Sequence, residues 1–425
     1  MVSDSVIFAP PVKQLGKLRA VPMDIQRVNA LVTIDAGDLW AVAVVRMWFR
    51  MGPAPGNAMF DLRQEIEGAW LDEAPIDSGL LGFHDLGGGQ GAEMRVIGVP
   101  LEARSDHMLR VQYQVKQPGS AESHGIVWDP MRERILWDFF MSDLKPGRYL
   151  EQWFPANFIY DQFALRLEIR LRNAAEHRPV TNAVVTELGF NHWVLEFPER
   201  YTALSHMLIL APAESLETLH SSVGAIRVET TQLRSTGFEL AEEQQRIHRW
   251  LEHYQAVVGP YAHEDRFTAY LWGNDRSMEY DGAVCSNPDA LEHELFHSWF
   301  ARGVKPATQN DGWIDEAWTM WSTEPNRFEV IPFDMSRPAV ELCSSNPYNR
   351  ATPGASYREG FRFFAGLASV MGVERLQEAM FELYRANPLR LLTTGELENH
   401  LSKRADVGPY FSRFVYGIDS SHDTT

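Results

Sequence analysis

The chain has 425 residues, a hydrophobic content of 45% and a formal net charge of −18. This length suits two or three domains, and the composition is ordinary for a globular protein. The acidic balance argues against nucleic-acid partners and anionic membrane surfaces, because both carry negative charge. The only two cysteines are Cys285 and Cys343, so no disulfide framework is expected.

The chain start and the hydropathy pattern predict a cytoplasmic protein. Residues 1–10 lack a basic region and a long apolar run, so they do not resemble a secretory signal. No stretch approaches the run of about eighteen apolar residues that a membrane span requires. A cytoplasmic location without a membrane partner is therefore expected.

The first half of the chain shows the alternation of apolar and polar residues that is typical of half-buried strands. In Phe163–Leu171 every odd position is apolar, and His107–Val115 alternates in a similar way. β-Branched residues are frequent in Asn29–Ile34 and Leu39–Phe49. We therefore predict an N-terminal β-rich domain over residues 1–212, folded as an antiparallel saddle or sandwich.

After Pro212 the pattern changes to that of a mixed α+β domain, which we expect over residues 213–425. The first expected elements are a strand at Ile226–Leu233, a helix at Glu239–Val258, and strands at Arg266–Trp272 and Met278–Cys285. The rest of the chain is predicted to be helical. Ser356–Glu359 and Thr393–Glu396 both have the form of a capping box, in which a hydroxyl and an acid satisfy backbone N–H groups at a helix start.

The segment His293–His297 has the sequence HELFH and carries the strongest functional signal. Residues four apart on a helix share one face, so the two imidazoles can bind one Zn²⁺ at about 2 Å each. Glu316, after eighteen intervening residues, would supply the third ligand, and Glu294 would accept a proton from the metal-bound water. Three protein ligands leave one position for water, as in catalytic zinc sites. Cys285 is interpreted as a small apolar residue in a strand rather than as a ligand.

Two predicted helices carry these residues. Asn287–Asp289 has the composition of a helix start and Gly303 that of a stop, which gives a first helix of about four turns. The second is predicted from Asp311 to Glu324, with Glu316 near its start. The alternative is a polar helix face with two surface histidines. The neighbouring apolar residues argue against it, because they predict buried helices, and buried imidazoles and carboxylates need partners. These neighbours are Leu291, Leu295, Trp299, Phe300, Trp313, Ile314, Ala317, Trp318 and Trp321.

Four motifs in this order resemble the zinc aminopeptidase family that includes alanyl aminopeptidases and leukotriene hydrolase. They are Val258–Tyr261, Arg276–Tyr280, His293–Trp299 and Trp313–Ala317. The likeness covers most of residues 200–417, with a weaker likeness at residues 148–171. It implies a β-saddle N-terminal domain, a thermolysin-like catalytic domain of the gluzincin type, and one Zn²⁺ per chain.

The resemblance also implies roles for individual residues. His293, His297 and Glu316 match the zinc ligands of the family. Glu294 matches the general base. Tyr357 matches a tyrosine whose phenol donates a hydrogen bond to the tetrahedral oxyanion, where a neutral donor stabilises developing negative charge.

The substrate-binding end of the site departs from the family pattern. Glu279 matches the glutamate that binds the free α-amino group of the substrate, but Arg276 and Tyr280 replace a Gly and an Asn of the family motif. The alternative for Glu279 is a solvated acid at a strand edge. Gln152 lies near the position of a family glutamine that helps to bind the amine. The family commonly continues into a helical C-terminal domain, whereas this chain ends soon after Phe411–Gly417, so we expect an open cleft or one that a partner subunit covers.

The predicted function is that of a zinc metallopeptidase, an aminopeptidase that removes N-terminal residues from peptides by zinc-activated water. Its partner would be a peptide or small amide with a free amino terminus, and an oligomer is left open. The first alternative is a zinc-dependent hydrolase of a specialised amide in a biosynthetic pathway, suggested by Arg276 and Tyr280. Arg302–Pro306 weakly resembles glycyl aminopeptidases, whose third ligand lies farther along the chain. A non-catalytic peptide-binding scaffold is the lesser alternative, since such relatives tend to lose a ligand or the base.

Overall fold

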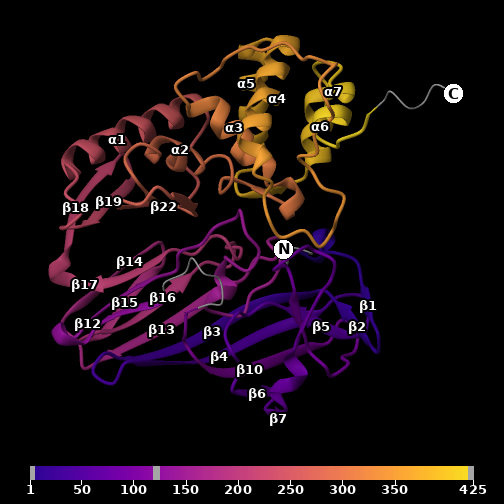
Figure 1. Ribbon diagram of the computed structural model, residues 1–425. Helices are drawn as coiled ribbons and strands as arrows, with labels where there is room; N and C mark the ends of the chain where they lie inside the picture. The colour runs from indigo at the N-terminus through magenta and orange to yellow at the C-terminus, as the bar shows by residue number, and fades with distance from the viewer. Residues whose placement is uncertain (1–4, 118–124, 420–425) are drawn as a thin grey trace. The chain divides into compact units, whose positions relative to one another are not determined.

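The computed structural model describes residues 5–117 and 125–419, and the chain forms two compact units. Unit 1 comprises Met1–Thr218 with Thr230–Phe238, and unit 2 comprises Leu219–Glu229 with Glu239–Thr425. The predicted α+β fold class is confirmed, because strands dominate the first half and the α-helices of the described residues all lie in the second half (Figure 1). The predicted domain ranges, 1–212 and 213–425, stay a prediction.

Three β-sheets make up most of the described part of unit 1. The largest has the strand order β15–β16–β13–β3–β4–β10–β6–β7. Its strands are β3 (Met23–Asp35), β4 (Trp40–Met51), β6 (Gly68–Leu71), β7 (Ala74–Ile76), β10 (Asp106–Gln114), β13 (Ala164–Arg172), β15 (Val184–Gly189) and β16 (His192–Phe197). A five-stranded sheet contains β1 (Lys13–Leu15), β2 (Leu18–Val21), β5 (Asn57–Phe60), β8 (Phe83–His84) and β9 (Met94–Val96). A four-stranded sheet contains β11 (Ile126–Asp129), β12 (Arg134–Asp138), β14 (His177–Thr181) and β17 (Leu208–Pro212).

The strand predicted at residues 163–171 is confirmed as β13. Leu165, Leu167 and Ile169 are buried, while the residues between them are partly exposed, because successive side chains of a strand point to opposite faces. β13 pairs antiparallel with β16 but parallel with β3. The prediction of an antiparallel sheet therefore holds for most strand pairs of the large sheet, but not for the pair β3–β13.

Unit 2 combines a five-stranded sheet and a two-stranded sheet with seven α-helices among its described residues. The five-stranded sheet has the order β18–β19–β20–β22–β21, with β18 (Leu216–Val223), β19 (Ile226–Leu233), β20 (Arg266–Leu271), β21 (Met278–Tyr280) and β22 (Ala283–Ser286). Residues 216–218 of β18 and 230–233 of β19 are assigned to unit 1. The pair β23 (Val304–Pro306) and β24 (Arg390–Leu392) is parallel. The helices are α1 (Leu240–Val257), α2 (Leu291–Phe296), α3 (Trp313–Thr323), α4 (Ala355–Met371), α5 (Val373–Ala386), α6 (Thr394–Ser402) and α7 (Gly408–Phe414). In Figure 1, α1 and α2 lie beside this sheet, and α4 to α7 form the orange and yellow group.

The strand predicted at residues 278–285 and the predicted start of α4 differ from the structure. The strand predicted at residues 278–285 is a hairpin, in which β21 and β22 pair antiparallel. Gly282 in its turn has a φ of 68°, a left-handed conformation that glycine adopts without strain. The capping box predicted at Ser356 is wrong, because α4 already begins at Ala355. The box at Thr393 and Glu396 is confirmed at the start of α6.

Helices α3 and α4 pack at very close range. A Cβ added at Gly360 of α4 would lie 2.4 Å from the Cβ of Ala317 on α3, so the absence of a side chain permits the approach. Trp313 of α3 contacts Phe363 and Phe364 of α4, with ring centroids 5.5 and 6.2 Å apart. This aromatic contact fixes the two helices that carry Glu316 and Tyr357 against each other.

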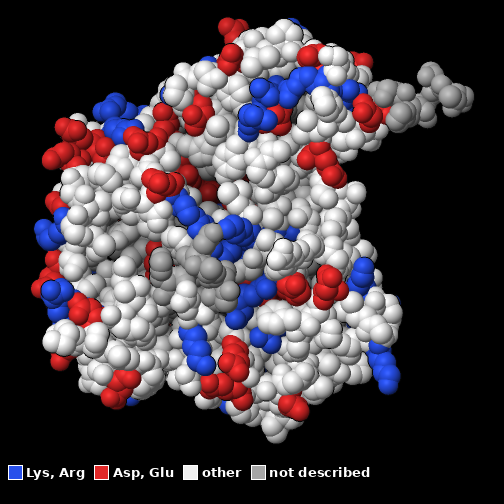
Figure 2. All heavy atoms as spheres, in the orientation of Figure 1, with Lys and Arg blue, Asp and Glu red and all other residues white. Residues whose placement is uncertain are grey.

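Helix α1, which was predicted at residues 239–258, is amphipathic. Leu240, Ile247 and Leu251 are buried, whereas Arg249 and Glu252 are exposed. Acidic and basic side chains gather over this helix at the upper left of Figure 2. Within residues 5–117 and 125–419, each helix falls short of the length and apolar character that crossing a bilayer demands.

Candidate metal centre

The HELFH segment occupies a shorter helix than predicted. α2 begins after Ala290, and His297 caps its C-terminus. The side chain of Asn287 accepts hydrogen bonds at 3.0 Å from two following backbone N–H groups, so it forms a turn ahead of the helix. The prediction of a four-turn helix up to Gly303 is therefore wrong. The single turn that places His293 and His297 on one face is nevertheless present.

Aromatic packing against α1 holds α2 in place. The ring of Tyr254 lies 4.8 Å from that of Phe296 and 5.4 Å from that of Trp299. The Tyr254 hydroxyl donates to Glu292 Oε1 at 2.8 Å, and Trp299 Nε1 donates to the Gly259 carbonyl at 3.0 Å. Both ends of this short helix are thus fixed by contacts with buried side chains.

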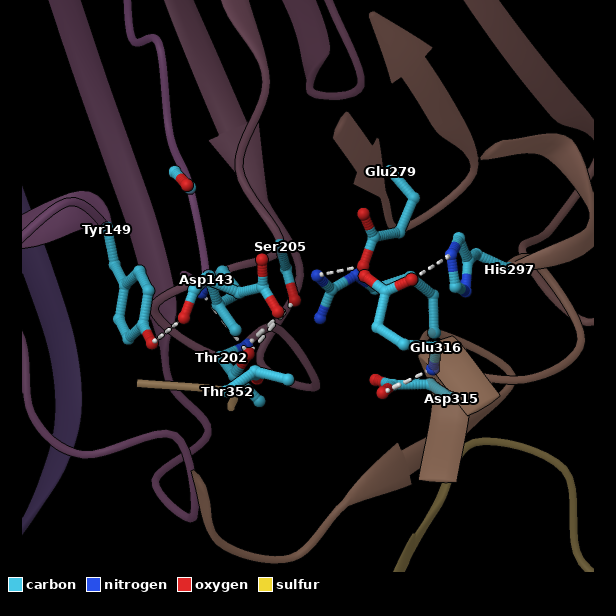
Figure 3. A network of polar contacts seen from close by, with 12 residues as sticks. Asp143, Tyr149, Thr202, Ser205, Glu279, His297, Asp315, Glu316 and Thr352 are labelled. Carbon is cyan, nitrogen blue, oxygen red and sulfur yellow. Dashed lines mark hydrogen bonds and ion pairs between the residues drawn. The ribbon is translucent and has the colours of Figure 1, made fainter. Parts of the chain in front are cut away.

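The structure brings the three predicted ligands together. His293 Nε2 lies 3.2 Å from Glu316 Oε2, and His297 Nε2 lies 3.7 Å from the same oxygen. The ligand atoms of these three residues all lie within 4.8 Å of one another. Figure 3 shows the Glu316 carboxylate turned toward His297, whereas that of Asp315 points away. Two nitrogens and one oxygen thus face a common centre.

The surroundings of His297 fit the requirements of a cation site. Its Nδ1 lies 2.9 Å from the Phe300 carbonyl, so the proton on Nδ1 is assigned from this contact and Nε2 carries the lone pair. Nε2 is buried and has no hydrogen-bond partner in the described part of the chain, yet it faces Glu316. Burial outweighs the attraction of Glu316 and lowers the pKa of His297 to about 3. Nε2 of neutral His297 has no proton to donate to Glu316, so its lone pair and the carboxylate repel each other unless a cation lies between them.

Tyr357 of α4 contacts the same cluster. Its hydroxyl donates to Glu316 Oε1 at 2.8 Å, while Glu316 Oε2 faces the histidines. Glu316 is therefore oriented from both sides. Tyr357 is thus hydrogen-bonded directly to Glu316, a candidate metal ligand.

Two further predicted residues border the cluster. The ligand atoms of Glu279, Glu294 and His297 also lie within 4.8 Å of one another. Both carboxylates belong to buried residues, with 6% of Glu279 and 7% of Glu294 exposed. Arg302 Nη2 donates to Glu279 Oε1 at 2.8 Å. The alternative of a solvated strand-edge acid is therefore wrong for Glu279.

Sequence reasoning missed two residues at this site. Thr319 lies one turn after Glu316, and its hydroxyl is 3.2 Å from His297 Nδ1, where it helps to orient the imidazole. The helical spacing between Glu316 and Thr319 could have indicated this contact. Arg302 gave no such signal, because its contact with Glu279 depends on how the chain turns after α2.

Two other sequence interpretations concern residues outside the cluster. Cys285 is buried on β22, and no cysteine belongs to the metal-capable groups among the described residues. Gln152 is buried in unit 1, where its amide donates to the Arg148 carbonyl at 3.0 Å. Its proposed part in binding the amine stays a prediction.

Several solved structures share this fold at low sequence identity. A mutant of the M1 zinc metallopeptidase from Deinococcus radiodurans, bound to Tyr-Ser-Ala, gives a TM-score of 0.63 at 14% identity over 93% of this chain and 95% of that chain. A mutant two-domain M1 zinc metallopeptidase bound to L-arginine gives 0.60 at 15% identity over 94% of both chains. Native yeast leukotriene A4 hydrolase gives 0.65 at 12% identity over 95% of this chain and 69% of its own.

Neither a protein-family model nor a curated protein sequence matches the chain. The similarity therefore rests on three-dimensional structure, where it spans both units. The likeness that the four motifs predicted is confirmed at the level of the fold. The chain has the fold of the two-domain M1 zinc metallopeptidases.

Proposed function

We propose that this chain is a zinc metallopeptidase and, more specifically, an aminopeptidase that removes N-terminal residues from peptides. The observation that carries the proposal is the convergence of His293, His297 and Glu316 around one centre, with the buried Nε2 of His297 facing a carboxylate. The fold shared with M1 zinc metallopeptidases supports it. The substrate would be a peptide or small amide with a free amino terminus.

In this proposal the three converging side chains hold one Zn²⁺. Two neutral imidazoles and one carboxylate form a donor set that suits zinc and leaves one coordination position open. Bound there, the ion would polarise the scissile carbonyl and lower the pKa of a water toward about 7. Phe300 and Thr319 orient His297 through its Nδ1.

Glu294 and Tyr357 would carry out the proton transfer and the stabilisation of charge. Glu294 accepts a proton from the attacking water and passes it to the nitrogen of the leaving amine. The Tyr357 hydroxyl exchanges its contact with Glu316 for a hydrogen bond to the developing oxyanion, which stabilises the transition state more than the substrate.

Glu279 would select the end of the chain that is cleaved. A carboxylate that borders the cluster can bind the ammonium of an unblocked peptide through a charge-assisted hydrogen bond. Fixing that ammonium places the first peptide bond, and no later one, beside the catalytic residues. The result is exopeptidase activity.

Aminoacyl-arylamides and N-blocked peptides, assayed with and without a chelator, test the proposed function. Unblocked substrates are expected to be cleaved, and their N-acetylated forms to be cleaved at least about tenfold less well, because acetylation removes the charge that Glu279 binds. A chelator is expected to abolish activity, and added Zn²⁺ to restore it. Equal cleavage of N-acetylated peptides would contradict the role of Glu279, and activity in chelator would contradict the role of zinc.

Tyr357→Phe removes the phenol hydroxyl, and two measurements, kcat and zinc content, distinguish its role toward the oxyanion from its contact with Glu316. Loss of one oxyanion donor is expected to lower kcat about 10²–10³-fold with little change in KM. Zinc content, measured by elemental analysis, is expected to stay at one per chain because the three ligands remain. Loss of zinc would contradict this expectation and show that the phenol is needed to hold Glu316 as a ligand.

A further inference from the structure

Glu279 is held by Arg302, for which the sequence predicted no part in the site. Arg302 Nη2 lies 2.8 Å from Glu279 Oε1, and the two side chains are 2% and 8% exposed. The dashed line at Glu279 in Figure 3 marks this contact. The last torsion of a glutamate is soft, so one buried, charge-assisted hydrogen bond decides which way its carboxylate faces.

The backbone of Arg302 is tied to the end of the metal-site helix. Its N–H donates to the His297 carbonyl at 2.9 Å. Ala301 has a φ of 115°, which residues other than glycine rarely adopt. A Cβ added at Gly303 would lie 2.4 Å from the Ser298 carbonyl oxygen, so the turn tolerates only glycine there. The position of Arg302 is therefore coupled to that of His297.

A second ion pair joins the same two segments. Lys305 Nζ lies 2.7 Å from Asp281 Oδ1, and their side chains are almost completely buried. Burial alone would raise the pKa of Asp281, but Lys305, His263 and Arg302 hold it below its usual value. Residues 279–281 and 302–305 thus contribute two buried acids and two buried cations. The charges balance within the network.

The charge of Arg302 also acts on the acidic groups of the site. Glu279 and Glu294 have carboxylate oxygens within 4.8 Å, a separation at which two anions in a buried environment repel each other. The guanidinium on Glu279 offsets this repulsion. Because it binds Oε1, the other oxygen of Glu279 can accept a hydrogen bond from an ammonium.

We propose that Arg302 is a positioning residue, which fixes the carboxylate of Glu279 and thereby sets the preference for substrates with a free amino terminus. The proposal rests on the proposed function, in which Glu279 binds the substrate amine. Arg302 itself need not touch the substrate. Lys305, which belongs to the same buried network but binds Asp281, provides a matched structural control.

The test compares the binding of alanyl-alanine with that of N-acetyl-alanyl-alanine by calorimetry. All proteins are full-length, loaded with zinc and carry Glu294→Gln, so neither ligand is hydrolysed. Against this parent, Arg302→Gln is expected to weaken alanyl-alanine binding about 10–100-fold and to leave the acetylated ligand unaffected. Arg302→Lys keeps the charge without the planar donor geometry, so an intermediate preference is expected. Lys305→Met is expected to lower Tm but to keep the parent's preference.

The same preference in Arg302→Gln and the parent would overturn the proposal, and so would equal weakening of both ligands. If Arg302→Gln does not fold, an unchanged preference in Arg302→Lys decides against it. Because Arg302 acts through Glu279, adding Arg302→Gln to Glu279→Gln is expected to change the preference no further. A further decrease would show that Arg302 binds the ligand directly.

Kinetics of the wild-type enzyme separate this inference from the proposed function. If the parent prefers alanyl-alanine and Arg302→Gln loses that preference, but the wild type hydrolyses no unblocked peptide, the proposed aminopeptidase activity is wrong and the role of Arg302 stands. If the wild type cleaves unblocked peptides and Arg302→Gln keeps the preference, only the role of Arg302 is wrong. A parent without any preference contradicts the roles of both Glu279 and Arg302.

Discussion

Glu294→Gln is expected to lower kcat by about 10²–10⁴-fold while one zinc per chain is retained. Glutamine has nearly the same shape as glutamate but cannot accept the proton of the attacking water. The three ligands that we propose, His293, His297 and Glu316, are untouched, so metal content measured by elemental analysis should match that of the wild type. Steady-state kinetics on an unblocked arylamide measures the loss of turnover.

Glu292→Gln is the matched control, because Glu292 lies on the same helix and the substitution is chemically identical. Its carboxylate contacts Tyr254 and Arg327 outside the cluster. Its kcat is expected to stay close to that of the wild type. If Glu294→Gln retained wild-type turnover with normal zinc content, a different group would have to serve as the general base.

His293→Ala and Glu316→Ala are expected to abolish stoichiometric zinc binding. Free Zn²⁺ at about 100 times its Kd stabilises a folded protein by about 2.7 kcal/mol, which corresponds to an increase in Tm of about 5–10 °C for a unit of this size. Calorimetric scans should show this increase in the wild type and not in either variant, because two ligands hold the ion far more weakly than three.

His248→Ala serves as the control for the loss of an imidazole. His248 lies on α1 and contacts Ser221, so it is not part of the cluster. This variant should retain the zinc-dependent increase in Tm. Stoichiometric zinc in both His293→Ala and Glu316→Ala would contradict the ligand set.

The elements of the site could be predicted where local sequence determines them. The helix at residues 239–258 and the strand at residues 226–233 have strong periodic patterns, and the structure places them as α1 and β19. The spacing within His293–His297 requires only one helical turn, so the two imidazoles share a face although α2 is much shorter than predicted. Glu316 was predicted as the third ligand from its position near the start of the next helix, and the resemblance supported that assignment.

The rest depended on contacts between distant segments. The aromatic residues after His297 indicated burial, but they did not indicate that the helix would end there and that the chain would turn back through Ala301. The partner of Glu279 could not be predicted, because ion pairs between segments 23 residues apart leave no local pattern. The contact of Tyr357 with Glu316 likewise depends on the close approach of α3 and α4.

If Glu279 binds the substrate amine as proposed, the length of the turn in the β21–β22 hairpin becomes a determinant of specificity. Glu279 pairs with Val284 across a turn of two residues, and successive side chains on β21 point to opposite faces. One additional residue in the turn would shift the register and present Met278 or Tyr280 where the acid now lies. Among proteins of this fold, insertions and deletions in this turn could therefore replace the carboxylate at this place by an apolar or a phenolic side chain, without any substitution at position 279.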